Sequence, residues 1–398
     1  MYLFFRNKIR PSLFIIFDHS ATSFLLKKII FTVTNDLTYD QRMIRICSSL
    51  ATEGYEVMLV GRKLKTTQPF DYQYIKHHRF SLLFNKGKLF YAEYNIRLFF
   101  WLLFQRFDIV CGIDLDTILP CYFASILRGR KPCVYDAHEL FTDTPEVERR
   151  PRIRKIWLAV ERFIVPRLTH CYTVSQSVAD EFKRRYGSKF EVIRNLPFKN
   201  KHLITQSNQV TQSPKVILYQ GALNEGRGLE QAIAAMEHVE NATFWLAGEG
   251  DLSQILRGMV VERKLENKVK FLGFIKPKDL PDITSKATIG LNLAEDKSLS
   301  YRLSLGNKFS DYIQAGIPQI CVQFIEFQRL NDAFDIALLV EKLDTQLIVN
   351  AINRLLTDPV LYAQLKENCV KAAAVLNWEN EEKKLKVFYE KILRGALK

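Results

Sequence analysis

The stretch Val216–Leu229 (VILYQGALNEGRGL) decides the fold of the second half of the chain. Its apolar start predicts a buried strand and its end opens a helix, so the three glycines between them form a strand-to-helix turn. Free backbone N–H groups at such a helix start attract anions, and Arg227 adds a permanent charge. The turn therefore predicts a phosphate or diphosphate site, although a glycine-rich turn beside a surface arginine has the same pattern. The spacing GxxxxGxG matches neither a dinucleotide fingerprint nor a P-loop.

Short apolar strands alternate with amphipathic helices on both sides of this turn. In the first half, strands are expected at 29–33, 56–60, 108–111, 133–136, 171–175 and 190–193. In the second half they recur at 216–219, 243–246, 269–272, 289–293 and 319–322, and helices follow at 344–356, 359–373 and 379–394. This alternation predicts two doubly wound, Rossmann-like α/β domains that face a central cleft, with ligands at the carboxyl ends of the strands.

The boundaries follow from changes in composition. We expect a leader or anchor outside the fold at residues 1–26, an N-terminal domain at 27–200 and a polar linker at 201–214. A C-terminal domain is expected at 215–375, followed by a helical segment at 376–398. The apolar run in the leader is too short to span a membrane and lacks a small-residue cleavage site.

A second candidate cluster lies in the segment SLGNKFSDYIQAGIP at 304–318. Lys308 and Asp311 lie three residues apart, on one face of the first turns of a helix. A lysine is unfavourable at a helix N-terminus unless it shares an anion with the free amides there. Asp311 can bind the two hydroxyls of a ribose. A capped surface helix with an ion pair is the alternative interpretation.

The first half offers candidates at the ends of its own strands. His138 follows an expected strand that ends at Asp136, where it can hydrogen-bond a sugar hydroxyl or face a developing charge; a capping or core histidine is the alternative. Asp40 and Arg42 begin the first helix and either orient an acceptor or pyrophosphate, or belong to a solvated helix face. The pair Asp114 and Asp116 is expected to cap a helix rather than to bind a metal.

The charge is distributed unevenly along the chain. The net charge is +14, of which residues 1–200 contribute +13 and the remainder +1. A polyanion or an anionic surface is therefore the expected partner of the first half. The segment Arg79–Phe107 mixes aromatic and basic residues, as an interfacial helix or a core helix would, and we expect its start to be exposed and its later residues to be buried. Single-stranded nucleic acid suits the same composition but has no accompanying fold signature.

The seven cysteines are widely spaced, with no CxxC and no histidine at zinc-ligand spacing. This pattern favours free core thiols in a reducing, cytoplasmic compartment. A metal site and disulfide bonds are not expected.

Several blocks in this order resemble the retaining GT-B glycosyltransferases of family 4, from about Lys28 onward. They are Gly221–Gly228, Gly248–Gly250, Phe271–Phe274 and Asn307–Ile320 in the second half, and Thr34–Arg62, Tyr135–Glu139 and Thr173–Ser177 in the first. The resemblance implies that the domain at 215–375 binds a nucleotide-sugar donor and that the domain at 27–200 is the acceptor-side domain. It also implies that the helix at 376–398 packs back toward the N-terminal domain. One departure concerns the family's pair of glutamates eight residues apart, because Leu303 and Asp311 stand at those positions.

Matched position by position, the resemblance implies roles for individual residues. The implied catalytic residues are His138 at the donor sugar and Arg227 and Lys308 at the diphosphate. Donor-binding residues would be Gly221, Asn224, Arg227, Gly248, Lys308 and Asp311, and acceptor-side residues Asp40, Arg42 and Glu139, the last as structural support. No metal and no cofactor are expected, and the cations and amides would stabilise the departing diphosphate instead.

The expected function is transfer of a sugar from a nucleotide-diphosphate sugar to an acceptor hydroxyl, with retention of configuration, in cell-surface glycan or glycolipid synthesis. The expected partners are the donor, a glycan or lipid-linked acceptor and an anionic membrane surface, without nucleic acid. The expected location is cytoplasmic, peripheral on the inner face of the membrane. A GT-B nucleotide-sugar epimerase and, because of Leu303, a non-catalytic membrane-associated subunit are the alternatives.

Overall fold

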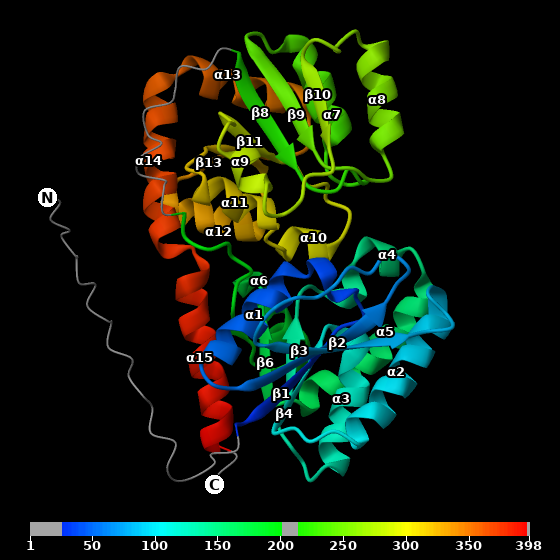
Figure 1. Ribbon diagram of the computed structural model, residues 1–398. Helices are drawn as coiled ribbons and strands as arrows, with labels where there is room; N and C mark the ends of the chain where they lie inside the picture. The colour runs from blue at the N-terminus through cyan, green and yellow to red at the C-terminus, as the bar shows by residue number, and fades with distance from the viewer. Residues whose placement is uncertain (1–25, 201–213, 396–398) are drawn as a thin grey trace, which may run out of the picture.

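The computed structural model describes residues 26–200 and 214–395, which form two α/β domains, one above the other in Figure 1. Each domain contains one fully parallel sheet, with strand orders β3-β2-β1-β4-β5-β6-β7 and β10-β9-β8-β11-β12-β13. In both sheets the order reverses beside the first strand, as in doubly wound folds. The predicted fold class is therefore confirmed. Nearly all of the expected leader and of the expected linker lie outside the described residues.

The N-terminal sheet is covered by helices on both faces. One face packs against α1 and, from the far end of the chain, α15; the other packs against α2, α3, α5 and α6. The strands are β1 (Lys28–Thr32), β2 (Glu56–Lys63), β3 (Ile75–Ser81), β4 (Ile109–Ile113), β5 (Cys133–Ala137), β6 (His170–Thr173) and β7 (Glu191–Val192). The helices are α1 (Gln41–Thr52), α2 (Gly87–Leu103), α3 (Leu115–Leu127), α4 (Pro145–Glu148), α5 (Pro151–Ile164) and α6 (Gln176–Tyr186).

The C-terminal sheet has its own core, built from the strands and the helices that surround them. Its strands are β8 (Lys215–Gln220), β9 (Ala242–Ala247), β10 (Val269–Gly273), β11 (Ile289–Asn292), β12 (Gln319–Val322) and β13 (Ala337–Val340). The helices are α7 (Leu229–Ala235), α8 (Ser253–Glu262), α9 (Leu280–Thr284), α10 (Leu299–Leu303), α11 (Asn307–Gln314), α12 (Ile325–Phe334), α13 (Thr345–Thr357) and α14 (Pro359–Val375).

The last helix, α15 (Trp378–Gly395), leaves the C-terminal domain and runs down the side of the N-terminal one (Figure 1). Trp378 is fully buried there, and its indole N–H donates to Ser49 Oγ of α1 at 3.0 Å. Phe388 and Tyr389 pack into the same cluster as the strands of the N-terminal sheet. This helix therefore completes the core of a domain that the chain began more than 300 residues earlier.

The strands β3 and β13 and the helices α4, α5, α10 and α12 were not predicted from the sequence. Only two of the seven residues of β3 are buried, and β13, α4 and α10 are only four or five residues long. None of the helices in the described part of the chain is long and apolar enough to cross a membrane. All seven cysteines are buried and free.

Candidate active site

The carboxyl ends of β8 and β9 bring two glycine loops into direct backbone contact. Gly221 follows β8 with φ of +129°, and Gly248 follows β9 with φ of +157°. A Cβ added to Gly248 would lie 1.9 Å from the carbonyl oxygen of Gly221, so only glycine fits there. Asn224 accepts a hydrogen bond from the backbone N–H of Asp251 at 3.1 Å. Its side chain therefore ties the first loop to the second.

Two cations converge on the first loop. Lys308, in the first turn of α11, lies with Nζ 4.6 Å from the centre of the Tyr219 ring, and its Cε lies close to Gly221. The guanidinium of Arg227 lies 4.9 Å from the centre of the Tyr301 ring. Burial and the charge of Arg227 lower the pKa of Lys308 to about 7. A lysine held in this state gains a proton when an anion arrives.

The start of α11 adds backbone donors to this cluster. Its N-cap residue is Gly306, and no side chain caps the first turn. Amides left free at a helix start, together with Arg227 and Lys308, give three kinds of donor for a diphosphate at the point where the strand order of the sheet reverses.

Asp311 lies one turn further into α11 and is positioned by Gln220 at the end of β8. Its Oδ2 accepts from Gln220 Nε2 at 2.8 Å, and Gln220 Oε1 in turn accepts from Thr284 Oγ1 at 2.7 Å. Burial raises the pKa of Asp311 to about 6, although the charge of Arg45 opposes the shift. Asp311 is thus largely ionised at neutral pH, and its Oδ2 already accepts a hydrogen bond from Gln220.

On the other side of the cleft, His138 follows β5 and lies between two carboxylates. Its Nε2 is 3.1 Å from Asp136 Oδ2, and its Nδ1 is 3.7 Å from Asp114 Oδ2. Burial disfavours the imidazolium, but the charges of Asp136 and Asp114 outweigh it and raise the pKa of His138 to about 9. The ring is therefore cationic at neutral pH, where it supplies positive charge and N–H donors and cannot accept a proton.

Arg42 is buried, whereas the sequence predicted either a solvated helix face or contact with an acceptor or pyrophosphate. The residue is 4% exposed, its Nη2 bonds Asp136 Oδ1 at 2.9 Å, and its Nη1 bonds the carbonyl oxygen of Ile193 at 3.1 Å. Neither a solvated helix face nor direct contact with an acceptor fits this burial. Burial disfavours ionisation of Asp136, but Arg42 and His138 outweigh it and lower the pKa of that carboxyl to about 2. Arg42 therefore positions His138 through Asp136.

The other two acceptor-side candidates differ from each other. Asp40 is the N-cap of α1 and accepts from the backbone N–H of Met43 at 3.1 Å, so its carboxylate serves the helix. Glu139 follows His138 directly and is partly exposed. Burial and the charges of Asp114 and Glu146 raise the pKa of Glu139 to about 8, which keeps it largely protonated at neutral pH.

Asp114 is a site residue that sequence reasoning missed. It is the N-cap residue of α3 by position, but its carboxylate accepts the backbone N–H of His138 at 2.8 Å instead of capping the helix. Its φ is +55°, a conformation that costs a residue other than glycine about 1 kcal/mol or more. Asp116 in the next turn accepts from Thr34 Oγ1 at 2.7 Å. In the described ranges, no group of three or more His, Cys, Asp or Glu side chains has the arrangement of a metal site.

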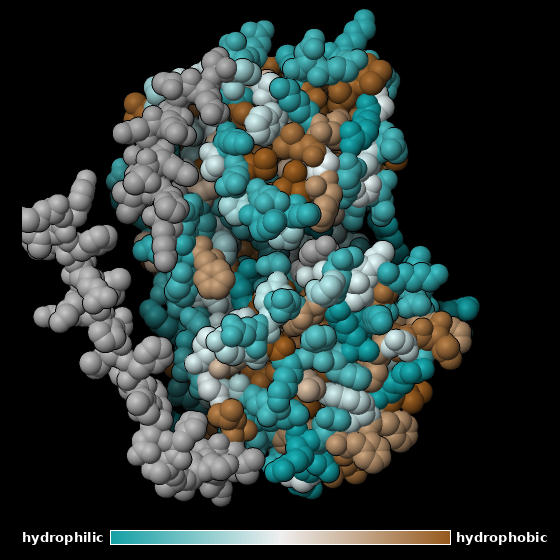
Figure 2. Space-filling model, viewed as in Figure 1, coloured by the Kyte–Doolittle hydropathy of each residue, from teal (hydrophilic) through white to brown (hydrophobic). Residues whose placement is uncertain are grey.

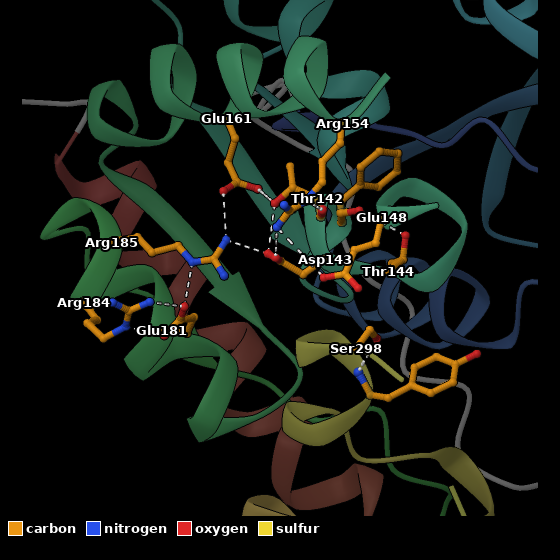
Figure 3. Close-up of polar contacts among 12 residues, drawn as sticks. Thr142, Asp143, Thr144, Glu148, Arg154, Glu161, Glu181, Arg184, Arg185 and Ser298 are labelled. Atoms are coloured by element: carbon orange, nitrogen blue, oxygen red, sulfur yellow. Dashed lines mark hydrogen bonds and ion pairs between the residues drawn. The ribbon is translucent and has the colours of Figure 1, made fainter. Parts of the chain in front are cut away.

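A buried ionic cluster fixes the segment that follows His138 (Figure 3). Asp143 accepts from Arg154 and from Arg185, each at 2.6 Å, and Arg185 also bonds Glu181 at 2.7 Å. Figure 3 shows these side chains converging from α5, from α6 and from the turn that contains Asp143. The turn contacts α10 of the other domain. The cluster therefore holds one wall of the cleft in place.

Leu303 has a structural explanation. It is 5% exposed and packs within the hydrophobic cluster of the N-terminal domain, while its carbonyl oxygen accepts from Ser175 Oγ at 2.9 Å. The position that carries the first glutamate in the resembling family is used here to dock α10 against the N-terminal domain. A second link across the cleft is the exposed ion pair of Arg149 and Glu225 at 3.1 Å.

Arg45 and Asn195 form a further connection that the sequence did not indicate. Arg45 in α1 donates to Asn195, and Asn195 Nδ2 donates to Asn307 Oδ1 at 2.9 Å, at the start of α11. This chain of hydrogen bonds joins the N-terminal domain to the helix that carries Lys308 and Asp311. Hydrogen bonds therefore link the two sides of the candidate site, and the charge of Arg45 also acts on Asp311.

Two cavities differ in their position relative to the candidate site. One of about 490 Å³ lies at the carboxyl ends of β11, β12 and β13 and is lined by Glu295 and Arg302 among others. The other, of about 840 Å³, lies at the amino ends of the strands of the N-terminal sheet, lined by Asp108, Pro132 and His170 among others. The first is adjacent to the glycine loop, because the N–H of Glu295 bonds the carbonyl oxygen of Gly226 at 3.0 Å.

Comparison with known proteins supports the fold and the family. Residues 41–196 match the family model Glycosyltransferase Family 4, and residues 200–373 match Glycosyl transferases group 1. An uncharacterized glycosyltransferase of Methanocaldococcus jannaschii is 31% identical over 98 residues, a match that spans 24% of this chain and 25% of that relative.

Solved structures share the two-domain arrangement at low sequence identity. Sucrose-phosphate synthase from Thermosynechococcus elongatus superposes with a TM-score of 0.75 at 18% identity, over 93% of this chain and 100% of that one. HepE from Anabaena, in complex with UDP, gives a TM-score of 0.69 at 15% identity, over 92% of this chain and 100% of that one. Together with the two family models, which adjoin along nearly the whole described chain, these similarities show that the protein belongs to the family 4, group 1 glycosyltransferases of GT-B fold.

Proposed function

We propose that the protein transfers a sugar from a nucleotide-diphosphate sugar to an acceptor hydroxyl. The observation that carries the proposal is the convergence of Arg227, Lys308 and the uncapped start of α11 on the loop at Gly221. Placed cations and amides stabilise the negative charge that develops on a departing diphosphate. HepE was solved with UDP and with UDP-glucose, which supports a nucleotide-sugar as the donor.

Each residue of the candidate site has a separate role in the proposed transfer. Arg227 and Lys308 neutralise the diphosphate, and Asp311, held by Gln220, accepts hydrogen bonds from the ribose. The cationic His138 donates from Nδ1 to a sugar hydroxyl, since this nitrogen lies beyond hydrogen-bond distance of Asp114. Gly221 and Gly248 allow the donor to approach the backbone. Because these groups already supply positive charge, we propose that transfer proceeds without a metal.

Retention of configuration and a role in cell-surface glycan synthesis also belong to the proposal. Both are supported by the sequence blocks shared with the retaining members of the family. The acceptor would be a glycan or a lipid-linked precursor, reached from the cytoplasmic side of a membrane. The anomeric configuration of the product, compared with that of the donor by NMR, tests retention directly.

Donor turnover tests the site. A purified sample is screened against a panel of nucleotide-sugars, with nucleotide release as the readout. Arg227→Ala should lower the turnover of the accepted donor roughly 100-fold, as loss of a charge donor to the transition state would. The matched control is Arg263→Ala, because Arg263 pairs with Glu237 on the surface, at the C-terminal end of α8. Wild-type turnover in Arg227→Ala would contradict the assignment.

A non-catalytic subunit is the second candidate, and Leu303 is the observation that favours it. A leucine cannot accept a hydrogen bond from a sugar hydroxyl, and its burial in the N-terminal cluster removes it from the cleft. Titration with UDP and GDP by calorimetry separates the candidates, because a subunit that has lost its donor site would bind neither. Donor conversion in the absence of any acceptor would instead indicate an epimerase.

A further inference from the structure

The helix α2 is apolar on both of its sides. Phe90, Tyr94, Leu98 and Leu102 recur every four residues and are buried against the N-terminal sheet. The opposite side should then be polar, as it is in the surface helices of globular proteins. It instead carries four large apolar side chains that are 50 to 85% exposed, namely Leu89, Ile96, Phe100 and Phe104.

Two neighbouring helices extend this apolar surface. The end of α3 exposes three large apolar residues, and α5 exposes three more. They are Phe123, Ile126 and Leu127 in α3, and Ile153, Ile156 and Phe163 in α5. Phe123 and Phe163 stack with their ring centres 6.2 Å apart, which joins the two helices at the surface. We call the exposed sides of α2, α3 and α5 the outer helix face; Figure 2 shows brown side chains gathered at the lower right, where α2 lies in Figure 1.

The exposed charges on the outer helix face are predominantly positive. Exposed lysines and arginines lie on the three helices and at their ends: Lys86, Lys88, Arg97, Arg106, Arg128, Arg130, Lys131, Arg152, Lys155, Arg162 and Arg167. The acidic residues of the same helices are turned inward or engaged. Asp116 and Glu161 are buried. Glu93 is 12% exposed, and its carboxylate pairs with Arg97 at 2.8 Å and accepts from the N–H groups of Leu83 and Phe84.

We infer that the outer helix face docks on a lipid bilayer that contains anionic lipids. Exposed Leu, Ile and Phe side chains enter the boundary between headgroups and acyl chains, and the surrounding cations meet the lipid phosphates. A second copy of the chain fits poorly, because two such faces would bring like charges together. Single-stranded nucleic acid fits poorly as well, because most of the exposed apolar side chains are aliphatic and offer no ring for a base to stack on.

Docking in this way places the cleft beside the membrane. The helix α5 contacts α4, and Arg149 at the end of α4 reaches across the cleft to Glu225 of the donor-side loop. An acceptor anchored in the bilayer would therefore be presented at the cleft entrance. The inference itself goes beyond the proposed function, because the face binds lipid whether or not the site transfers a sugar.

Co-sedimentation of the full chain with vesicles tests the inference. The two vesicle types are phosphatidylcholine alone and phosphatidylcholine with about one third phosphatidylglycerol. The test variant is Ile96→Asn with Phe100→Asn, at positions that are 58% and 56% exposed. The matched control is Ile255→Asn with Val261→Asn in α8, at positions that are 58% and 61% exposed on the other domain.

The wild-type protein and the control should sediment with anionic vesicles and much less with neutral ones. The test variant should lose at least about tenfold in partition coefficient, because two apolar side chains no longer enter the bilayer. Thermal unfolding followed by circular dichroism verifies that both variants are folded, and nucleotide release on a soluble donor should be unchanged in both. If the proposed function is wrong, the wild-type protein releases no nucleotide from any donor but still binds anionic vesicles.

Three results would overturn the inference. One is equal vesicle binding by the test variant and the wild-type protein. Another is a dimer, seen by light scattering, that the test variant abolishes, because the face would then be an interface between copies. The third is displacement of the protein from vesicles by single-stranded oligonucleotides at micromolar concentration, which would assign the face to nucleic acid.

Discussion

Binding of a nucleoside diphosphate should be linked to protonation of Lys308. Burial and the charge of Arg227 lower the pKa of the free side chain from 10.5 to about 7. A diphosphate beside it favours the ammonium form and raises that pKa again. As the pH rises above 7, the free protein loses the proton that the complex needs, so binding weakens as the pH increases. The bound complex must then take up a proton from solution.

The magnitude follows from the free pKa. With a pKa of about 7 in the free protein and a bound pKa near the ordinary value of 10.5, the affinity for UDP should fall about 15-fold between pH 7 and pH 8.5. The terminal phosphate of UDP, with a pKa of about 6, is already about nine-tenths ionised at pH 7, so its titration changes the affinity by only about 10% in this range. Asp311, with a pKa of about 6, is also ionised throughout.

Calorimetry provides the assay. UDP is titrated at pH 7.0, 7.75 and 8.5 in two buffers of different ionisation enthalpy, so that the difference in heat counts the protons taken up. Lys308→Arg keeps the charge at every pH and should flatten the dependence, whereas Lys270→Arg, on the exposed side of β10, should retain it. A wild-type slope in Lys308→Arg, or equal heats in the two buffers at pH 8.5, would refute the linkage.

Two further changes probe the packing behind the site. Gly248→Ala places a Cβ 1.9 Å from the carbonyl of Gly221 and should lower the free energy of unfolding by about 1 to 3 kcal/mol, with loss of UDP binding. Gly258→Ala, in the open middle of α8, should instead be neutral or stabilise by up to about 1 kcal/mol in the same urea titrations. Arg42→Met leaves the buried Asp136 with His138 as its remaining ionic partner, and should cost about 3 kcal/mol by urea unfolding at pH 7, the lower end for a broken buried pair; a cost below about 1 kcal/mol would show that the pair is not isolated from water.

The sequence predicted those elements whose burial is evident from an apolar pattern within the element itself. Strands such as β1 and β4 are buried on both faces. Their sequences are therefore short apolar runs that can be located directly in the sequence. The edge strand β3 has the sequence IKHHRFS, in which only Ile75 and Phe80 are buried, and it was therefore missed. The exposed side of α2 was misread for the opposite reason, because apolar residues beyond Lys88 were expected to be core.

The candidate site was predictable where one segment carries its own chemistry. The glycine loop and Lys308 lie in continuous motifs, and the structure brings them together. Arg42 was not predictable, because its burial depends on Asp136, which is 94 positions away in the sequence. The orientation of Asp311 depends in the same way on Gln220, a strand residue with no signal of its own.

The crossing of α15 to the opposite domain gives the protein an order of assembly. Trp378, Phe388 and Tyr389 cover one face of the N-terminal sheet, yet a ribosome makes them only after the strands of both sheets. At about 5 to 20 residues per second, that face waits roughly 10 to 40 seconds after β7 has been synthesised. During translation the nascent chain therefore carries an open apolar sheet face, and the C-terminal domain can finish folding before the N-terminal one. Folding of the N-terminal domain is therefore completed late, when α15 packs against the sheet that was synthesised first.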